Sequence, residues 1–201
     1  MATPRIIGGS VKGMRLRGIP GDSTRPVTDR VKEAVFNILG ADIEDANMLD
    51  LFGGTGSIGL EALSRGAAFV RFCELNRAAQ NVLKENIELT GFKKQAELIA
   101  GDAFRLLRAT PDKRFEYIYI APPQYKQMWV KALQSLDKNE RWLSDDGWLI
   151  VQIHPVEIEP VELEHFVCFD ERRYGSSALL FFERTAHPEQ QPPLFKSRVP
   201  A

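Results

Sequence analysis

The stretch Asp50-Leu-Phe-Gly-Gly-Thr-Gly-Ser-Ile-Gly59 decides the fold of this chain. It overlaps an apolar run, 48–52, that predicts a short buried strand, and it continues into 58–63, where apolar residues fall at helical spacing. Its four glycines let the backbone approach a ligand closely, and the start of the helix presents unpaired N–H groups. Strand, glycine turn and helix in this order predict a nucleotide-type binding loop. The alternative is an ordinary tight turn between a strand and a helix.

The identity of the ligand depends on two acidic residues. Gly54-x-Gly56-x-x-Gly59 fits the dinucleotide fingerprint, and Glu74 stands twenty residues after Gly54, where a ribose-binding acid belongs. That pattern alone favours a nicotinamide oxidoreductase. Asp50, at the mouth of the loop, would instead repel a pyrophosphate and suit an amino group and a sulfonium, as in S-adenosylmethionine. Two unit charges ~4 Å apart at an effective dielectric of ~20 interact by roughly 4 kcal/mol, which favours this second ligand.

Length, composition and charge place the chain in a broad class. With 201 residues, 44% hydrophobic and 26% charged, it is expected to be a soluble globular protein with one main domain. Residues 1–30 carry a net charge of +4, and the remainder carries −5. A basic segment on an acidic body predicts a polyanionic partner, with a solvated, disordered arm as the alternative. The basic residues are Arg5, Lys12, Arg15, Arg17, Arg25 and Arg30.

The two cysteines, Cys73 and Cys168, each lie inside an apolar run. They are expected to be reduced core residues, and the sequence contains no cluster of metal-ligand type. No stretch has the character of a signal peptide or the length of an apolar membrane span. We therefore expect a cytoplasmic protein with neither a metal site nor a membrane partner.

The N-terminal segment, 1–28, is predicted to form a basic extension built on a small β-hairpin. Short strand-like pieces in it are interrupted by glycines. Alternation of Met14 and Leu16 with Arg15 and Arg17 would place apolar side chains on one face and guanidinium groups on the other. Such a ribbon can lay its cations along a phosphate backbone.

A capped helix is predicted over 28–39. Thr28 or Asp29 can cap it, and its apolar residues form one stripe. Phe36 and Asn37 lie off that stripe. They either contact the ligand cleft, pack in the interior or face solvent.

The remaining pattern alternates strands with helices, over 29–184, and predicts a doubly wound, Rossmann-like α/β sheet. The sheet is expected to be mostly parallel, with a C-terminal antiparallel hairpin and ligands at the carboxyl ends of the strands. Predicted strands are 68–75, 96–100, 115–120, 148–153, 166–175 and 178–183, and predicted helices are 77–90 and 129–136. A Pro/Glu-rich link covers 154–164, and 185–201 is predicted to be a disordered tail.

Polar residues follow several of these strands. Glu74 ends one strand and can accept hydrogen bonds from two ribose hydroxyls. Asp102 follows another and can accept from an adenine amino group, or else cap a helix. Pro122-Pro123 forces a stiff exit from a third strand, which leaves a carbonyl to face a substrate, and Tyr125 can stack on a base. An ordinary structural turn is the alternative for these prolines.

From about residue 4 to 184 the chain resembles the class I S-adenosylmethionine-dependent methyltransferases. It is most similar to the RsmD-type family, which methylates the exocyclic N2 amine of a guanine in small-subunit (16S) ribosomal RNA. The resemblance is carried by Arg5-Ile-Ile-Gly-Gly9 with Lys12-Gly13, Arg25-Pro26 with Arg30–Leu39, Asp50–Gly66 and Arg173-Tyr-Gly175. It implies that the basic hairpin holds the RNA. The cofactor-binding residues that it implies are Asp50, Phe52, Gly53, Gly54, Thr55, Gly56, Glu74, Leu75, Asp102 and Ala103.

The chain departs from this family at the catalytic turn, which usually begins Asp-Pro-Pro followed by Tyr or Phe. Here the turn reads Ala121-Pro-Pro-Gln-Tyr125. Loss of one preorganised polar group of this kind can cost ~10²–10³ in rate. The carbonyl of Pro122 can still accept a hydrogen bond, Gln124 can supply a side-chain oxygen, and Tyr125 can stack one position later. Catalysis is therefore assigned to Pro122, Pro123, Gln124 and Tyr125.

Two functional hypotheses follow from this departure. The first is an active methyltransferase that modifies a base amino group in ribosomal RNA or in the small ribosomal subunit. The second is a catalytically impaired RNA-binding protein that keeps the methyltransferase fold. The nicotinamide oxidoreductase remains a third.

Overall fold

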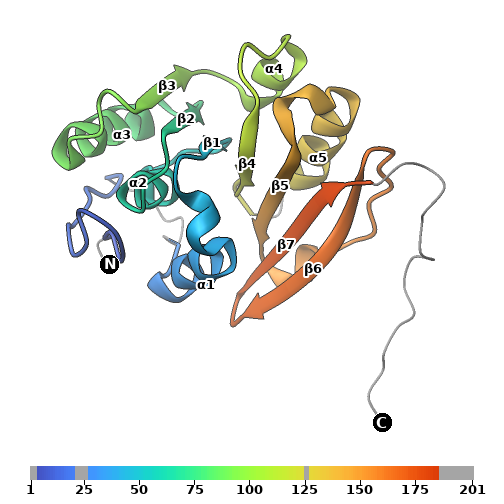
Figure 1. Ribbon diagram of the computed structural model, residues 1–201, viewed down its shortest axis with the longest axis horizontal. Helices are drawn as coiled ribbons and strands as arrows, with labels where there is room; N and C mark the ends of the chain where they lie inside the picture. Colours follow the sequence, from blue (N-terminus) through green and yellow to red (C-terminus); the bar gives the residue numbers. More distant parts are fainter. Residues whose placement is uncertain (1–3, 21–26, 125–126, 186–201) are drawn as a thin grey trace.

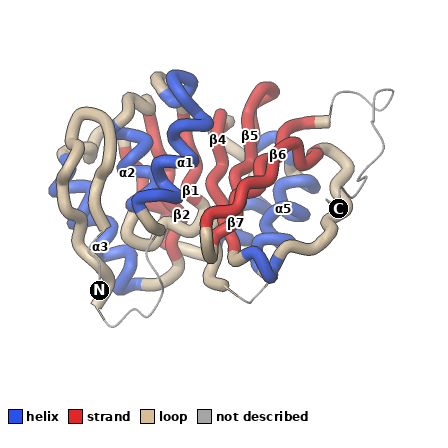
Figure 2. The backbone as a smooth tube through the Cα atoms, turned by 90° about the horizontal axis from the view of Figure 1, so that it is seen from below, coloured by secondary structure: helices blue, strands red, loops and turns tan. Residues whose placement is uncertain are grey.

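The computed structural model describes residues 4–20, 27–124 and 127–185. These residues form one seven-stranded sheet with helices on both of its faces (Figures 1 and 2). The strands are β1 (Asn47–Asp50), β2 (Phe69–Glu74), β3 (Ala96–Ala100), β4 (Phe115–Ile120), β5 (Leu143–Ile153), β6 (Phe166–Tyr174) and β7 (Ser177–Arg184). The α-helices are α1 (Asp29–Leu39), α2 (Ser57–Ser64), α3 (Arg77–Thr90), α4 (Ala103–Arg108) and α5 (Met128–Lys138), and three short 3₁₀ turns follow α1, α5 and β5.

The strand order is β3-β2-β1-β4-β5-β7-β6. Strands β1 to β5 pair in parallel, so their carboxyl ends share one edge of the sheet. The order reverses direction between β1 and β4, which is the topological switch point where such sheets bind ligands. Strand β7 runs antiparallel to both β5 and β6, which forms the predicted C-terminal hairpin. The doubly wound, mostly parallel α/β fold predicted from the sequence is confirmed.

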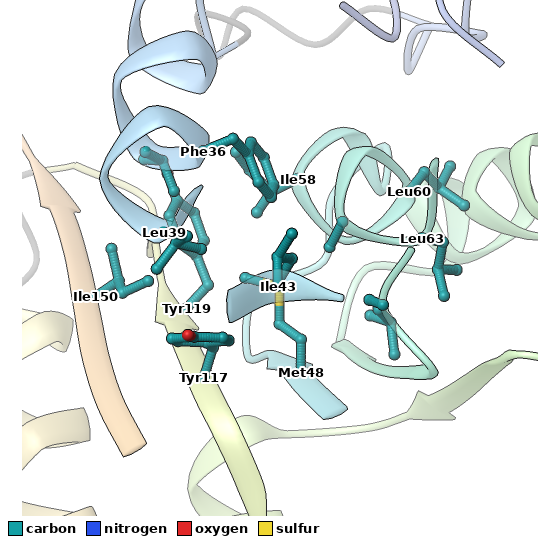
Figure 3. Close-up of a cluster of buried hydrophobic side chains, with 14 of the residues drawn as sticks. Phe36, Leu39, Ile43, Met48, Ile58, Leu60, Leu63, Tyr117, Tyr119 and Ile150 are labelled. Carbon is teal, nitrogen blue, oxygen red and sulfur yellow. The ribbon is translucent and has the colours of Figure 1, made fainter. Parts of the chain in front are cut away.

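Two hydrophobic clusters fill the space between the sheet and its helices. One lies under α1, α2 and α3 and includes Phe36, Ile58 and Met48 (Figure 3). The other lies under α4 and α5 and includes Trp129 and Phe104. The central strands read as apolar runs because each is covered on both faces.

Local signals set several element boundaries. The Oγ1 of Thr28 accepts a hydrogen bond from the Val31 N–H at 3.4 Å and so caps α1. Gly91, with φ 79°, ends α3 in a left-handed conformation that favours glycine. Phe36 is buried in the core and Asn37 is exposed, so packing and solvent exposure are the outcomes for these two residues.

The predicted N-terminal hairpin is not formed as two strands. Within 4–20 a single isolated antiparallel bridge joins Arg5 to Arg15, and the rest is turn and loop. The two arms still pair through backbone hydrogen bonds, from the Ile6 N–H to the Met14 carbonyl at 2.8 Å and from the Leu16 N–H to the Pro4 carbonyl at 2.7 Å, and the turn between them bonds to Ser64 of α2. A Cβ on Gly9 would lie 1.7 Å from the Ser64 carbonyl oxygen, so only glycine fits this contact.

Strand β5 begins at Leu143, five residues earlier than predicted. Its register against β4 shifts between the pairs Phe115–Leu143 and Tyr117–Trp148, so four residues of β5, 144–147, stand opposite one residue of β4 as a bulge. Three of them are Asp145, Asp146 and Gly147. Those three residues are turn formers, which is why the sequence indicated a later start. Arg25, Tyr125 and the tail beyond Thr185 lie outside the described residues.

Both cysteines are free thiols in the described structure. Burial raises the pKa of Cys73 to about 12 and that of Cys168 to about 11. Within the same residues, no helix is both long and apolar enough to cross a membrane. No group of three or more His, Cys, Asp or Glu side chains there is arranged to hold a metal ion.

Candidate active site

The glycine loop joins β1 to α2 at the switch point. Gly56 has φ 80°, and its N–H donates to the Gly53 carbonyl at 2.7 Å, which closes a tight turn just before the helix. A Cβ on Gly56 would lie 2.3 Å from Leu83, and one on Gly59 would lie 2.3 Å from the Phe72 ring. These two glycines let α2 and α3 pack closely against the loop and β2. The strand, glycine turn and helix predicted from the sequence are present, and close approach of the loop backbone to a ligand stays a prediction.

Asp50 lies under this loop with 3% of its surface exposed. Its Oδ2 accepts a hydrogen bond from the Gly59 N–H at 3.3 Å. Burial raises the Asp50 pKa to about 7, the nearby charge of Glu74 adds to the rise, and the hydrogen bond from Gly59 opposes it. At neutral pH the site therefore contains a carboxyl group poised between its neutral and charged forms.

Glu74 holds the loop from the neighbouring strand. One carboxylate oxygen accepts from the Gly54 N–H at 2.8 Å, and the other accepts from the Asn76 N–H at 2.7 Å. Next to it, Leu75 is 67% exposed, an unusual position for a leucine at the mouth of a polar site. An acid beside an exposed apolar side chain suits a ligand that has hydroxyl groups and a flat ring.

Asp102 caps α4, because its Oδ1 accepts from the Arg105 N–H at 2.8 Å. Of the two roles that the sequence offered for Asp102, the structure shows the helix cap. Ala103 is buried at the first position of α4. Phe52 packs edge-on against Phe104 of the same helix, with ring centroids 6.3 Å apart.

The strand order brings the three acids together. Asp50, Glu74 and Asp102 end or follow β1, β2 and β3, which are adjacent in the sheet. The Gly101 N–H donates to the Glu74 carbonyl at 2.9 Å and ties the second acid to the third. No sequence signal determines the order of the strands in the sheet. The grouping of the three acids was still predictable, because the carboxyl ends of parallel strands lie at one edge.

The turn after β4 borders the same edge. Strand β4 pairs with β1, and the Leu51 N–H donates to the Tyr119 carbonyl at 2.9 Å. Ala121 is half-buried, Pro122 is buried, and both Pro123 and Gln124 are exposed. Burial raises the Tyr119 pKa well above its ordinary value, and its hydroxyl donates to the Gln152 side chain.

Five of the six predicted RNA-binding cations lie in the described residues, and all five are exposed. Arg5 pairs with Asp29 at 2.8 Å, and Arg17 pairs with Glu85 at 3.2 Å. Within the described parts of the chain, Lys12 and Arg15 take part in no ion pair. The Arg30 guanidinium lies over the Tyr174 ring, 5.9 Å from its centroid.

A buried ion pair that the sequence reasoning missed anchors the N-terminal segment. Lys32 on α1 and Glu61 on α2 both have fully buried side chains, 3.6 Å apart. Lys32 also donates to the Arg5 carbonyl, and Glu61 accepts from the Ile7 N–H at 2.8 Å. The available signal was a charged residue at an otherwise apolar position of each helix.

Asn86 on α3 is a second missed contact, and it is fully buried. Its side-chain amide donates to the Thr55 carbonyl at 2.9 Å and to the Arg17 carbonyl at 3.1 Å. Its Oδ1 accepts from the Arg17 N–H at 2.7 Å. One side chain thus links the glycine loop to the basic N-terminal segment.

Comparison with known proteins places this arrangement in a family. The model of the family described as "Conserved hypothetical protein 95" matches residues 4–183. YlbH of Bacillus subtilis is 35% identical over 90% of this chain and 98% of its own length. Ribosomal RNA small subunit methyltransferase D of Escherichia coli is 32% identical over 92% of each chain. The solved structure of the Escherichia coli protein yhhF is 31% identical and has a TM-score of 0.81, covering 91% of this chain and 98% of that one.

The match spans nearly the whole described region, and the fold agrees with that of the solved relative. The chain belongs to this family, the S-adenosylmethionine-dependent methyltransferases of RsmD and YlbH type.

Proposed function

We propose that this protein transfers a methyl group from S-adenosylmethionine to the exocyclic N2 amine of a guanine in small-subunit ribosomal RNA. The observation that carries the proposal is the grouping of three acids, a glycine loop and the Pro122-Pro123 turn at one switch point. The relative named for small-subunit ribosomal RNA, similar along 92% of this chain, supports the choice of substrate.

The residues at the switch point fit the cofactor chemically. The Asp50 carboxylate favours the ligand's amino group, the carboxylate of Glu74 can accept from ribose hydroxyls, and Asp102 can accept from the adenine amine. Exposed Leu75 offers an apolar surface for the adenine ring. Backbone groups of Phe52, Gly53, Gly54, Thr55, Gly56 and Ala103 complete the proposed binding surface.

When bound, S-adenosylmethionine supplies an electrophilic methyl group on its sulfonium. A bond forms between the amine nitrogen and this methyl group as the bond from methyl to sulfur breaks and a neutral thioether leaves. The chain's own task is to present the amine, whose lone pair is delocalised into the guanine ring. The Pro122 carbonyl and the Gln124 side-chain oxygen each accept a hydrogen bond from one of its two N–H groups, which localises the lone pair toward the methyl group. Pro122 is buried, which makes the turn rigid. The proton that the amine loses on methylation passes to solvent.

Mass spectrometry of nucleosides from small-subunit ribosomal RNA tests the proposed target. In cells that carry the gene we expect one N2-methylguanine that is lost when the gene is deleted and restored by a plasmid copy. An unchanged set of methylated guanines after deletion would contradict the proposed target.

Ligand binding is expected to depend on pH through Asp50. The Asp50 pKa is about 7, so below this pH its carboxyl group is mostly protonated. Asp50 must then lose its proton before the carboxylate can bind the ligand's cationic amino group. The affinity for S-adenosylhomocysteine should therefore fall as pH drops below about 7, by up to about tenfold per pH unit. Calorimetry across this range measures the effect.

The matched control is Asp50→Asn, which keeps an oxygen acceptor and removes the titration. It should bind more weakly and with a flat pH profile. For the free protein the sign is opposite, because a raised carboxyl pKa means that ionisation of Asp50 costs stability as pH rises toward 7. A pH profile shared by wild type and Asp50→Asn would reject this role.

Ala121 favours a second candidate function, a catalytically impaired RNA-binding protein. The two candidates differ in what Ala121→Asp does to the rate of methyl transfer. If Pro122 and Gln124 form a working variant site, an added carboxylate leaves the rate unchanged or lowers it. If the site is impaired, the substitution raises the rate, by as much as ~10²–10³. Single-turnover transfer of labelled methyl groups distinguishes them.

A further inference from the structure

A shallow pocket lies between α1 and the turn that joins β6 to β7, outside the site described above. Figure 1 shows this turn beside α1. The lining residues are Arg30, Glu33, Ala34, Asn37, Ile38 and Tyr174. Arg30, Glu33 and Asn37 are exposed, and Tyr174 is half-buried. Tyr174 belongs to the Arg-Tyr-Gly stretch that the proposed function leaves without a role.

The pocket lies at the same edge of the sheet as the catalytic turn. The carboxyl end of β5 pairs with the start of β7, Ile153 with Ala178, so the β6–β7 turn projects beyond that edge. Gly175, with φ 61°, forms part of this turn. In the order β4-β5-β7-β6, this turn lies two to three interstrand spacings from β4, or roughly 10–14 Å across the sheet.

The two turns also share one face of the sheet. Ala121 of the catalytic turn and Tyr174 both pack against the hydrophobic cluster under α1. Ala34 and Ile38, which line the pocket, pack against that cluster as well. A strand of RNA with its target base at Pro122 can therefore follow the surface toward α1 without crossing the sheet.

The chemistry of the pocket suits a nucleotide. The Arg30 guanidinium lies over the Tyr174 ring, 5.9 Å from its centroid. An unpaired base can stack on this ring when the exposed Arg30 side chain turns from it toward the phosphate. The Asn37 amide and the Glu33 carboxylate provide donors and acceptors at the rim, and both are accessible to a base edge. Arg30 adds a positive charge for the adjacent phosphate.

We propose that this pocket holds a nucleobase close to the target guanine in the same RNA strand, stacked against Tyr174 with its phosphate near Arg30. This inference rests on the proposed function, since it names a second contact to the same substrate. The N-terminal cations can contact any phosphate backbone, whereas this pocket would contact only an RNA that has an unpaired base.

The test compares Tyr174→Ala with Tyr174→Phe, which keeps the ring. Loss of one stacked base costs ~1–3 kcal/mol, or about 5- to 150-fold. We expect Tyr174→Ala to raise KM for under-methylated small-subunit RNA, and Kd for a fluorescent single-stranded RNA, by a factor in this range. Tyr174→Phe should stay close to wild type, and neither variant should change the affinity for S-adenosylhomocysteine. Tyr174→Ala also removes packing against the cluster under α1 and should lower the Tm, so binding is measured well below the Tm of each variant.

Arg30→Ala should also weaken RNA binding. The control is Arg108→Ala, which removes the same charge from an exposed position of α4 on the opposite face of the sheet and should weaken RNA binding less. Unchanged KM and Kd in Tyr174→Ala would overturn the proposal. Equal losses in the Ala and Phe variants would also overturn it. If wild type transfers no methyl but its RNA affinity depends on the Tyr174 ring, the pocket stands and the proposed reaction falls.

Discussion

Replacing Glu61 by alanine is expected to lower the free energy of unfolding by about 3–5 kcal/mol, because it leaves a buried charge without its partner. Glu61 accepts from the Ile7 N–H and from the Arg65 side chain, each at 2.8 Å, and lies 3.6 Å from the Lys32 ammonium. Burial already lowers the Lys32 pKa, and the charge of Glu61 opposes that shift. Without Glu61, Lys32 retains Asp29 at 4.0 Å as its carboxylate.

Urea denaturation measures this loss. Glu88→Ala is the matched control, since Glu88 is an exposed helix residue paired with Lys93 at 3.7 Å and should cost under about 1 kcal/mol. Glu61→Gln, which can still accept a hydrogen bond from the Ile7 N–H, serves if the alanine variant fails to fold. Its loss of unfolding free energy should lie between those of Glu61→Ala and Glu88→Ala. Amide exchange at Ile7 should accelerate in both Glu61 variants. A cost for Glu61 no larger than that for Glu88 would refute the anchoring role.

Replacing Glu74 by alanine is expected to weaken binding of S-adenosylhomocysteine by about 100-fold or more. Two losses combine. The ligand loses a charged acceptor for its hydroxyls, worth ~1.5–3 kcal/mol per hydrogen bond. The loop loses the contact between Glu74 and the Gly54 N–H, 2.8 Å long, which sets its position.

Calorimetry with purified protein checks this prediction. Glu88→Ala again serves as the control and should bind like wild type, because its side chain is exposed on α3 and pairs with Lys93. Thermal unfolding of the Glu74 variant, recorded in parallel, separates lost binding from lost structure. A folded Glu74→Ala protein with near wild-type affinity would show that this acid does not contact the ligand.

The sequence predicted those parts of the fold that depend on local signals. Strands β3 and β4 and helix α3 have the predicted bounds, because apolar periodicity and a terminal glycine such as Gly91 mark them directly. The proximity of Asp50 to Glu74 was also predictable, because the carboxyl ends of parallel strands lie at the same edge of the sheet. The burial of Asp50, and with it the raised pKa, required the packed structure.

The features that escaped prediction depend on contacts between distant residues. The N-terminal hairpin expected from alternation forms one bridge and a few backbone hydrogen bonds, and the contacts of this segment with Glu61 and Ser64, more than fifty residues away in sequence, were not predicted. The sequence analysis gave Lys32 no role, and its burial depends on its partner Glu61 on α2. The Tyr174 pocket depends on the order β5-β7-β6, which no periodicity reveals.

The most direct test of the central claim is transfer of labelled methyl groups from S-adenosylmethionine to small-subunit RNA, free or assembled, from cells lacking this gene. Wild-type protein should label one guanine at N2, and RNA from cells that carry the gene should accept almost none. Gln124→Ala should transfer more slowly while binding the cofactor normally. Normal cofactor binding with no transfer to any under-methylated RNA or subunit would contradict the claim.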